Sequence, residues 1–146
     1  MHNIKEHYMK DVMITVKGIQ AQPDGTEEDC IELLTEGKYS HDGENSTITY
    51  LESELTGFEG CITTFRISPE YVVMNRVGSG SGDMVFDTGK RHQYYYETPA
   101  GNVTLGIDTL SIKNELGEDG GDLEIHYLLD LDTKVFSRNS FVINIK

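Results

Sequence analysis

Basic side chains are scarce in this sequence. Of its 146 residues, 12 are Lys or Arg and 25 are Asp or Glu, which gives a formal net charge of -13 at pH 7. Proteins that bind nucleic acid neutralise phosphates with clusters of Lys and Arg, and docking on anionic lipid uses the same residues. We therefore expect neither nucleic acid nor a membrane surface among the partners of this chain.

Long apolar segments are absent as well. No run approaches the ~20 apolar residues that a transmembrane helix needs. The opening residues, Met1 to His7, contain no apolar core of a secretory signal. In a chain without such a signal, the two cysteines, Cys30 and Cys61, are expected to be reduced. These features predict a cytoplasmic protein.

Helical spacing is almost absent too, and strand alternation takes its place. From Leu123 to Leu131 every odd position is apolar or aromatic, and three of the four even positions are polar. Such a period of two indicates a strand with one buried face. Residues 12–16, 103–107 and 141–145 alternate in the same way. Only residues 26–36 leave an alternative open, because Ile31, Leu33 and Leu34 also fit a short helical turn.

Turn segments rich in Gly, Asp and Asn separate the strand-like runs at short intervals. Short links make neighbouring strands antiparallel, and many strands without helices must hide their edges by closing into a barrel or by folding into two sheets. We predict an all-β fold, a single antiparallel up-and-down β-barrel of about ten strands with a lipocalin-like interior. It would occupy residues 11–146 as one domain after an N-terminal extension of residues 1–10. A two-sheet β-sandwich is the alternative. The runs lie at about residues 11–28, 28–40, 46–55, 60–68, 70–78, 83–88, 91–98, 102–115, 121–132 and 134–146.

An ordered series of short motifs runs through the middle of the chain. Its members are Tyr50-Leu-Glu52, Gly57, Thr63-Thr64, Val73-Met-Asn-Arg76-Val-Gly78, Met84-Val-Phe86-Asp-Thr-Gly89, Tyr96-Glu-Thr98-Pro-Ala-Gly101 and Thr109. In order and spacing this series resembles the YwiB-like family of small bacterial proteins, over about residues 10 to 145. The resemblance implies a calycin-like (lipocalin-like) β-barrel in a bacterial, cytoplasmic setting. It implies no reaction.

Two arginines within predicted strands are candidates for anchoring a ligand inside the barrel. A guanidinium stays charged and offers a planar fork of donors to a carboxylate or phosphate. Arg76 shares a strand face with Val72 and Met74, which favours an inward position. Arg66 lies on the more polar face of its run, opposite Phe65, and so favours solvent, although it stays in the candidate set.

Further polar and aromatic residues complete the candidate site. Tyr50, Tyr94 and Tyr96 add hydroxyl groups on apolar rings, and Glu52 is positioned to pair with either arginine. The alternative is structural: an Arg–Glu pair that fixes the register of the strands, and tyrosines that pack across the sheet.

Other motifs carry no chemistry by themselves. Gly78–Asp83 lacks the Gly-Lys-Ser/Thr ending of a phosphate-binding loop. The acidic segment 118–124 lacks the alternating register of a calcium loop. The five histidines show no zinc spacing. We therefore predict no metal and no cofactor.

Three classes of function remain. The first is a non-enzymatic barrel that binds a small anionic or amphiphilic ligand in its lumen, with Arg76 as anchor and a cavity of a few hundred Å³. The second is a structural or interaction module, possibly a homodimer formed through a sheet face that carries Val85 and Tyr95. The third is an enzyme, which would need titratable groups such as His126 and Glu52 to meet in a cleft.

Overall fold

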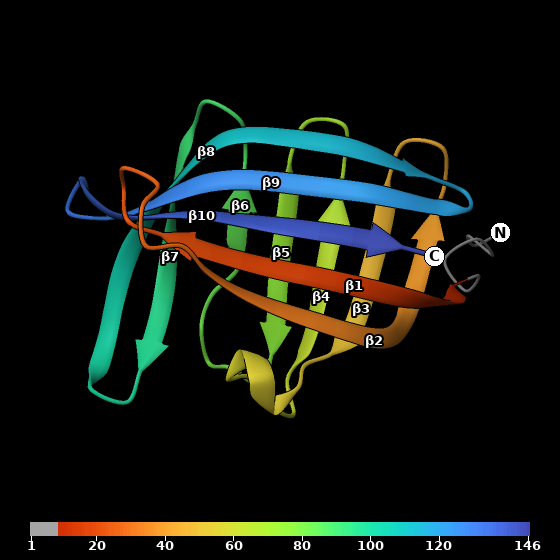
Figure 1. The fold of residues 1–146 in the computed structure, drawn as a ribbon, viewed down its shortest axis with the longest axis horizontal. Coiled ribbons are helices and arrows are strands. Elements are labelled where there is room, and N and C mark those ends of the chain that lie inside the picture. The colour runs from red at the N-terminus through yellow and green to blue at the C-terminus, as the bar shows by residue number, and fades with distance from the viewer. Residues whose placement is uncertain (1–8) are drawn as a thin grey trace, which may run out of the picture.

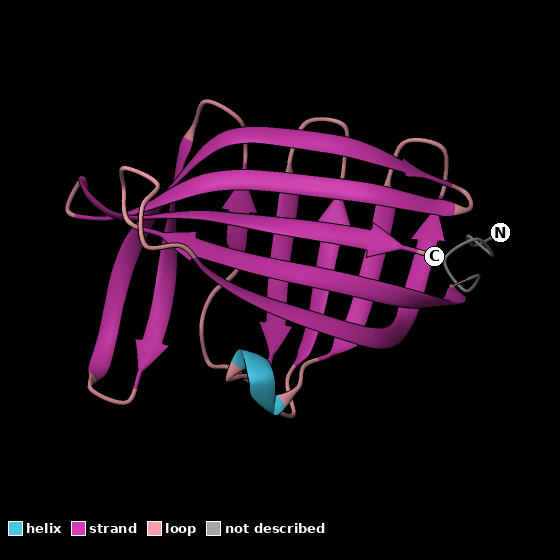
Figure 2. Ribbon diagram, viewed as in Figure 1, coloured by secondary structure: helices cyan, strands magenta, loops and turns pink. Residues whose placement is uncertain are grey.

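The computed structural model describes residues 9–146 and contains ten β-strands and one short 3₁₀ helix (Figures 1 and 2). The segment for which a helical turn was the alternative, residues 26–36, contains no helix and belongs to strand β2 (Asp29–His41) from Asp29 onward. Of the predicted N-terminal extension, residues 1–8 lie outside the described part, and Lys10 begins the first strand. The elements are β1 (Lys10–Ala21), β2 (Asp29–His41), β3 (Ser46–Leu51), η2 (Glu54–Thr56), β4 (Ile62–Ile67), β5 (Val72–Val77), β6 (Met84–Phe86), β7 (Arg91–Thr98), β8 (Gly101–Gly117), β9 (Gly120–Leu131) and β10 (Lys134–Ile145).

The strands form one antiparallel sheet in the order β6-β5-β4-β3-β2-β1-β10-β9-β8-β7. All but one of the neighbouring pairs follow each other in the chain. The exception joins the first strand to the last, with Ile14 opposite Ile145. The long strands β1, β2, β8, β9 and β10 form the front wall in Figure 1, and β3 to β6 form the rear wall. The predicted up-and-down β-barrel is therefore confirmed.

The barrel is nearly closed, and its seam lies between β6 and β7. Backbone contacts of the neighbouring loops bridge this seam in place of strand pairing. Gly82 N donates to Tyr95 O at 2.9 Å, and Gly89 N donates to Thr109 O at 3.0 Å. The glycine-rich segment before β6 thus serves as a strand connection that covers the free edge of β7.

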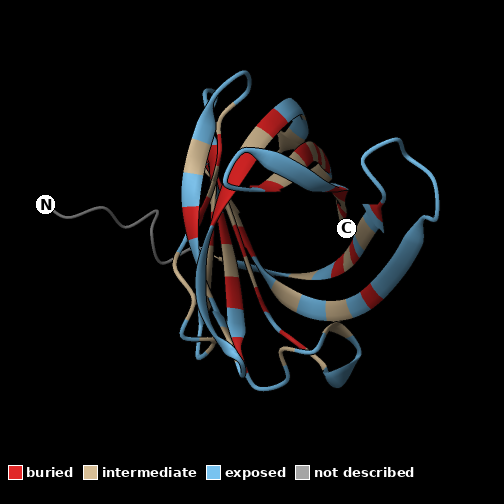
Figure 3. Ribbon diagram, turned by 90° about the vertical axis from the view of Figure 1, so that its left-hand side faces the viewer, coloured by how far each residue is buried: buried red, intermediate tan, exposed pale blue. Residues whose placement is uncertain are grey.

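Alternate side chains point into the barrel, as the banding of buried and exposed residues along the strands shows (Figure 3). Apolar residues fill much of the interior. Phe141 packs edge-on against Phe65 with ring centres 5.5 Å apart, and it stacks on Tyr127 at 5.8 Å. The largest fully buried side chains include Tyr39, Phe65, Phe86, Ile14, Ile48, Ile67, Met74, Ile107, Leu123, Ile125 and Ile143.

The alternation predicted for residues 123–131 holds only in the first part of β9. Leu123, Ile125 and Tyr127 are buried, but Leu131 is exposed and Asp130 is buried. Asp130 belongs to the polar phase, and the side chain of Arg91 pairs with it on the outside of the barrel. A charged partner from another strand therefore buries a residue that the sequence pattern assigned to solvent.

Candidate functional site

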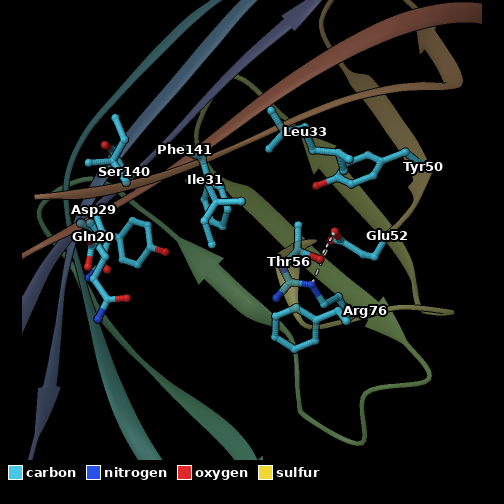
Figure 4. Close-up of a pocket in the computed structure, with 16 residues that line it drawn as sticks. Gln20, Asp29, Ile31, Leu33, Tyr50, Glu52, Thr56, Arg76, Ser140 and Phe141 are labelled. Carbon is cyan, nitrogen blue, oxygen red and sulfur yellow. Dashed lines mark hydrogen bonds and ion pairs between the residues drawn. The ribbon is translucent and has the colours of Figure 1, made fainter. Parts of the chain in front are cut away.

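A pocket of about 200 Å³ opens at the end of the barrel next to η2 (Figure 4). Its volume lies below the 300–1,000 Å³ typical of small-molecule sites, so it would hold only a small ligand. It also differs from the enclosed cavity expected from the sequence, because exposed residues such as Gln20, Asp29 and Ile31 form part of its lining. The lining is apolar at Val16, Ile31, Leu33, Phe58 and Phe141, and polar at Gln20, Asp29, Tyr50, Glu52, Thr56, Arg76, Tyr127, Asn139 and Ser140.

Strand register places three polar side chains in one row on the rear wall. Tyr50 on β3 lies opposite Thr63 on β4, and Thr63 lies opposite Arg76 on β5. Neighbours in register lie on the same face of a sheet, so all three point inward together with the buried Phe65. The hairpins that connect these strands therefore bring Tyr50 and Arg76 into the same pocket.

Glu52, which follows β3, is a buried carboxylate with several hydrogen-bond donors around it. Its Oε1 accepts from Thr56 Oγ1 at 3.0 Å, and its Oε2 accepts from Thr63 Oγ1 at 2.5 Å and from Arg76 Nε at 3.2 Å. The side chain of Glu52 is only 1% exposed. A buried charge needs such compensation, because an unpaired one is strongly destabilising.

Arg76 is held from two sides. The carbon at the centre of its guanidinium lies 3.9 Å from the centre of the Phe58 ring, within the range of a cation–π contact. Within residues 9–146, its only side-chain hydrogen bond is the one from Nε to Glu52. The side chain is 13% exposed and lines the pocket. Among the described residues, the two terminal nitrogen atoms therefore have no hydrogen-bond partner.

Tyrosine rings surround this arginine, although they do not all line the pocket. Burial raises the pKa of Tyr50, and the nearby Glu52 carboxylate raises it further. Burial likewise raises the pKa of Tyr127. Both hydroxyls thus stay neutral donors up to strongly alkaline pH. Tyr94 and Tyr96 share the inner face of β7 with ring centres 5.8 Å apart, but they are not among the pocket-lining residues.

Arg66 does not line the pocket. It is exposed on the outer face of β4, whereas Cys61, Phe65 and Ile67 of the opposite phase are buried, as the sequence predicted. Including Arg66 among the lumen candidates was wrong, because successive side chains of a strand point to opposite faces.

A second polar row was missed by the sequence reasoning. Register joins Asp29 on β2 to Gln20 on β1, Gln20 to Asn139 on β10, and Asn139 to Tyr127 on β9. Tyr127 already lies on the apolar phase of the run Leu123 to Leu131, and Asn139 extends the apolar phase of residues 141–145 by one step, which was the signal that could have located it. The row borders the pocket opposite Arg76.

Comparison with known proteins agrees with this barrel. A family model described as "Domain of unknown function (DUF1934)" matches residues 14–143. The chain belongs to this family. Its structure is similar to the crystal structure of the ywiB protein from Bacillus subtilis, with a TM-score of 0.72 over 97% of this chain and 98% of that one, at 22% identity. Identity at that level establishes the fold alone. The structural match confirms the resemblance to the YwiB-like family. None of the curated proteins compared with the chain matches it.

The groups that an enzyme on this DUF1934 barrel would need are only partly brought together. Glu52 and Arg76 meet, but His126 lies 3.1 Å from Glu124, and His92 lies 3.5 Å from Asp87. In the part of the chain from residue 9 onward, no three His, Cys, Asp or Glu side chains cluster as metal ligands would. No helix in that same part has the length and hydropathy of a transmembrane segment.

Proposed function

We propose that this DUF1934 protein is a non-enzymatic binding barrel that holds a small anionic or amphiphilic molecule in the pocket beside Arg76. The observation that supports it is the state of that arginine, which is largely buried, held by Glu52 and Phe58, and left with donors at both terminal nitrogens. The proposal places the protein in the bacterial cytoplasm, with support from Cys30 and Cys61 being free thiols.

The lining of the pocket is consistent with this role. Ligand sites in proteins are mostly apolar, with a few polar groups that fix the orientation of the ligand. Here Ile31, Leu33 and Phe141 supply apolar contact, and Arg76 and the hydroxyl of Tyr50 supply polar contacts. A ligand that fits a pocket of about 200 Å³ has on the order of ten non-hydrogen atoms, and at about 0.3 to 1.5 kcal/mol per atom its affinity would lie between the millimolar range and well below micromolar.

The test combines a natural and an artificial ligand. Native mass spectrometry of the protein purified from its source should show a bound small molecule. The same spectrum also distinguishes a monomer from a homodimer by its mass. For the artificial ligand, para-methylbenzoate is titrated into labelled protein and followed by NMR. We expect shifts at Tyr50, Thr63 and Phe141.

Two arginine variants test whether para-methylbenzoate binds at Arg76. Arg76→Gln should weaken the binding of para-methylbenzoate at least tenfold, because it removes the charged donors that hold the carboxylate. Arg66→Gln is the matched control, since Arg66 lies on the outer face, and it should leave the affinity unchanged. Equal affinity for both variants, or no shifts in a folded wild-type protein that also lacks a bound molecule, would refute the proposal.

A further inference from the structure

The pocket has two polar sides of different character. Figure 4 shows Arg76 with Glu52 on one side, Gln20 with Asp29 on the other, and Ile31 and Phe141 between them. The first side presents the terminal donors of a guanidinium. The second side presents a carboxylate, two amides and a tyrosine hydroxyl, in the row Asp29, Gln20, Asn139 and Tyr127.

The second side is suited to a hydrogen-bond donor or a positive charge. Asn139 uses its amide nitrogen to donate to Ser137 Oγ at 2.8 Å, which leaves its carbonyl oxygen as an acceptor. Asp29 is an exposed side chain with two oxygen acceptors in the lining of the pocket. No Lys or Arg contributes to this side, because Arg76 is the only basic residue among those that line the pocket in the described part of the chain.

The charge balance of the site also favours a ligand that carries a positive group. Glu52 already compensates Arg76, so a ligand with a single negative charge would leave the pocket with an excess of negative charge, to which Asp29 adds. The net charge of -13 further disfavours a purely anionic ligand. A positive group on the same ligand would balance this excess of negative charge.

We infer that the ligand of this pocket is dipolar, with a carboxylate or similar acceptor group that binds Arg76 and an ammonium or other cationic donor group that binds the side formed by Asp29, Gln20 and Asn139. Its middle section is apolar and packs between Ile31 and Phe141. This inference rests on the proposed function and narrows its ligand class.

Three matched probes test the inference. The first, para-(aminomethyl)benzoate, carries both charges; para-methylbenzoate carries only the negative charge, and para-methylbenzylamine only the positive one. NMR titration of the full chain should give the tightest binding for the dipolar probe, by about fivefold over para-methylbenzoate, which is the effect expected of one partly solvated ion pair.

The variant Asp29→Asn separates this inference from the proposed function. It should abolish the fivefold advantage of the dipolar probe and leave the affinity for para-methylbenzoate unchanged or slightly higher. Asp24→Asn, in the exposed turn that precedes β2, is the control and should preserve the advantage. Dipolar and anionic probes that bind equally in the wild type would overturn the dipolar class while the Arg76-anchored site stands. Absence of binding by every probe would overturn the dipolar class, and together with a purified protein that lacks a bound molecule it would overturn the proposed function as well.

Discussion

Arg91 on β7 forms a double hydrogen bond with Asp130 on β9, across the intervening strand β8. Its Nε donates to Oδ2 at 2.9 Å, and its Nη2 donates to Oδ1 at 2.7 Å. Gly106 on β8 lies directly beneath the pair, opposite Asp130 in register. The ion pair therefore links β7, the strand at the seam of the barrel, to β9, from which β8 separates it.

Gly106→Ala tests the space that this ion pair needs. A Cβ atom at Gly106 would lie 2.4 Å from Arg91 Nη2 and from Asp130 Oδ2, so the pair would have to separate. We expect the free energy of unfolding to fall by about 1 kcal/mol, the low end of the cost of overpacking, because the displaced atoms are the ends of side chains. Urea denaturation measures it. Gly18→Ala is the control, since its Cβ would meet nothing within 4 Å. Equal losses in both variants would contradict this account.

The stability of the barrel should depend on pH through Asp130. The hydrogen bonds from Arg91 hold the pKa of Asp130 well below its usual range. Since an unfolded Asp titrates near pH 3.9, the stabilisation is present above about pH 4 and is lost as the pH falls towards the folded pKa. Asp130→Asn should therefore lower the Tm by several degrees at pH 7, and the difference from the wild type should narrow below pH 4.

Asp108 provides the comparison for this measurement. Burial and its contact with Asp130 raise the pKa of Asp108, so its charge opposes folding at neutral pH. Asp108→Asn should leave the Tm at pH 7 unchanged or raise it. A large loss of Tm in this variant, equal to that of Asp130→Asn, would show that the two carboxylates act as one unit.

The Glu52–Arg76 pair should be strongly coupled. Glu52→Gln and Arg76→Met each leave the other charge buried without its partner, and each should lower the free energy of unfolding by about 3 kcal/mol. The double variant should lose much less than the two single losses together, because no unpaired charge remains. A double-mutant cycle by chemical denaturation measures this, and additive losses would show that the two side chains act independently.

The buried tyrosines should titrate only when the protein unfolds. Burial raises the pKa of both Tyr50 and Tyr127, so neither hydroxyl should ionise while the barrel stays folded. Ultraviolet titration of Tyr127→Phe should match that of the native wild type and differ only after unfolding. A native titration amplitude that falls in Tyr127→Phe would contradict the burial of this hydroxyl.

The same shifts predict how stability changes at alkaline pH. Above about pH 10 the unfolded chain binds fewer protons at these tyrosines than the folded chain does, so the free energy of unfolding should fall as the pH rises. Denaturation curves at increasing pH measure this fall. A stability that stays constant across this range would contradict the predicted burial of the two hydroxyls.

Local patterns in the sequence predict the all-β class, the antiparallel meander and the inward face of several strands. A period of two and short turns are local properties, and local geometry alone makes successive side chains alternate and neighbouring strands antiparallel. For the same reason the inward position of Arg76 and the outward preference of Arg66 followed from the residues beside them in the chain.

Contacts between residues far apart in the sequence depend on the three-dimensional fold. The pairing of β1 with β10 brings Gln20 beside Asn139, and the curvature of the sheet sets both opposite Arg76. Burial of Asp130 depends in the same way on Arg91, which lies 39 positions away in the sequence. Strand register and barrel closure arise from contacts between remote segments, and no local period of the sequence encodes them.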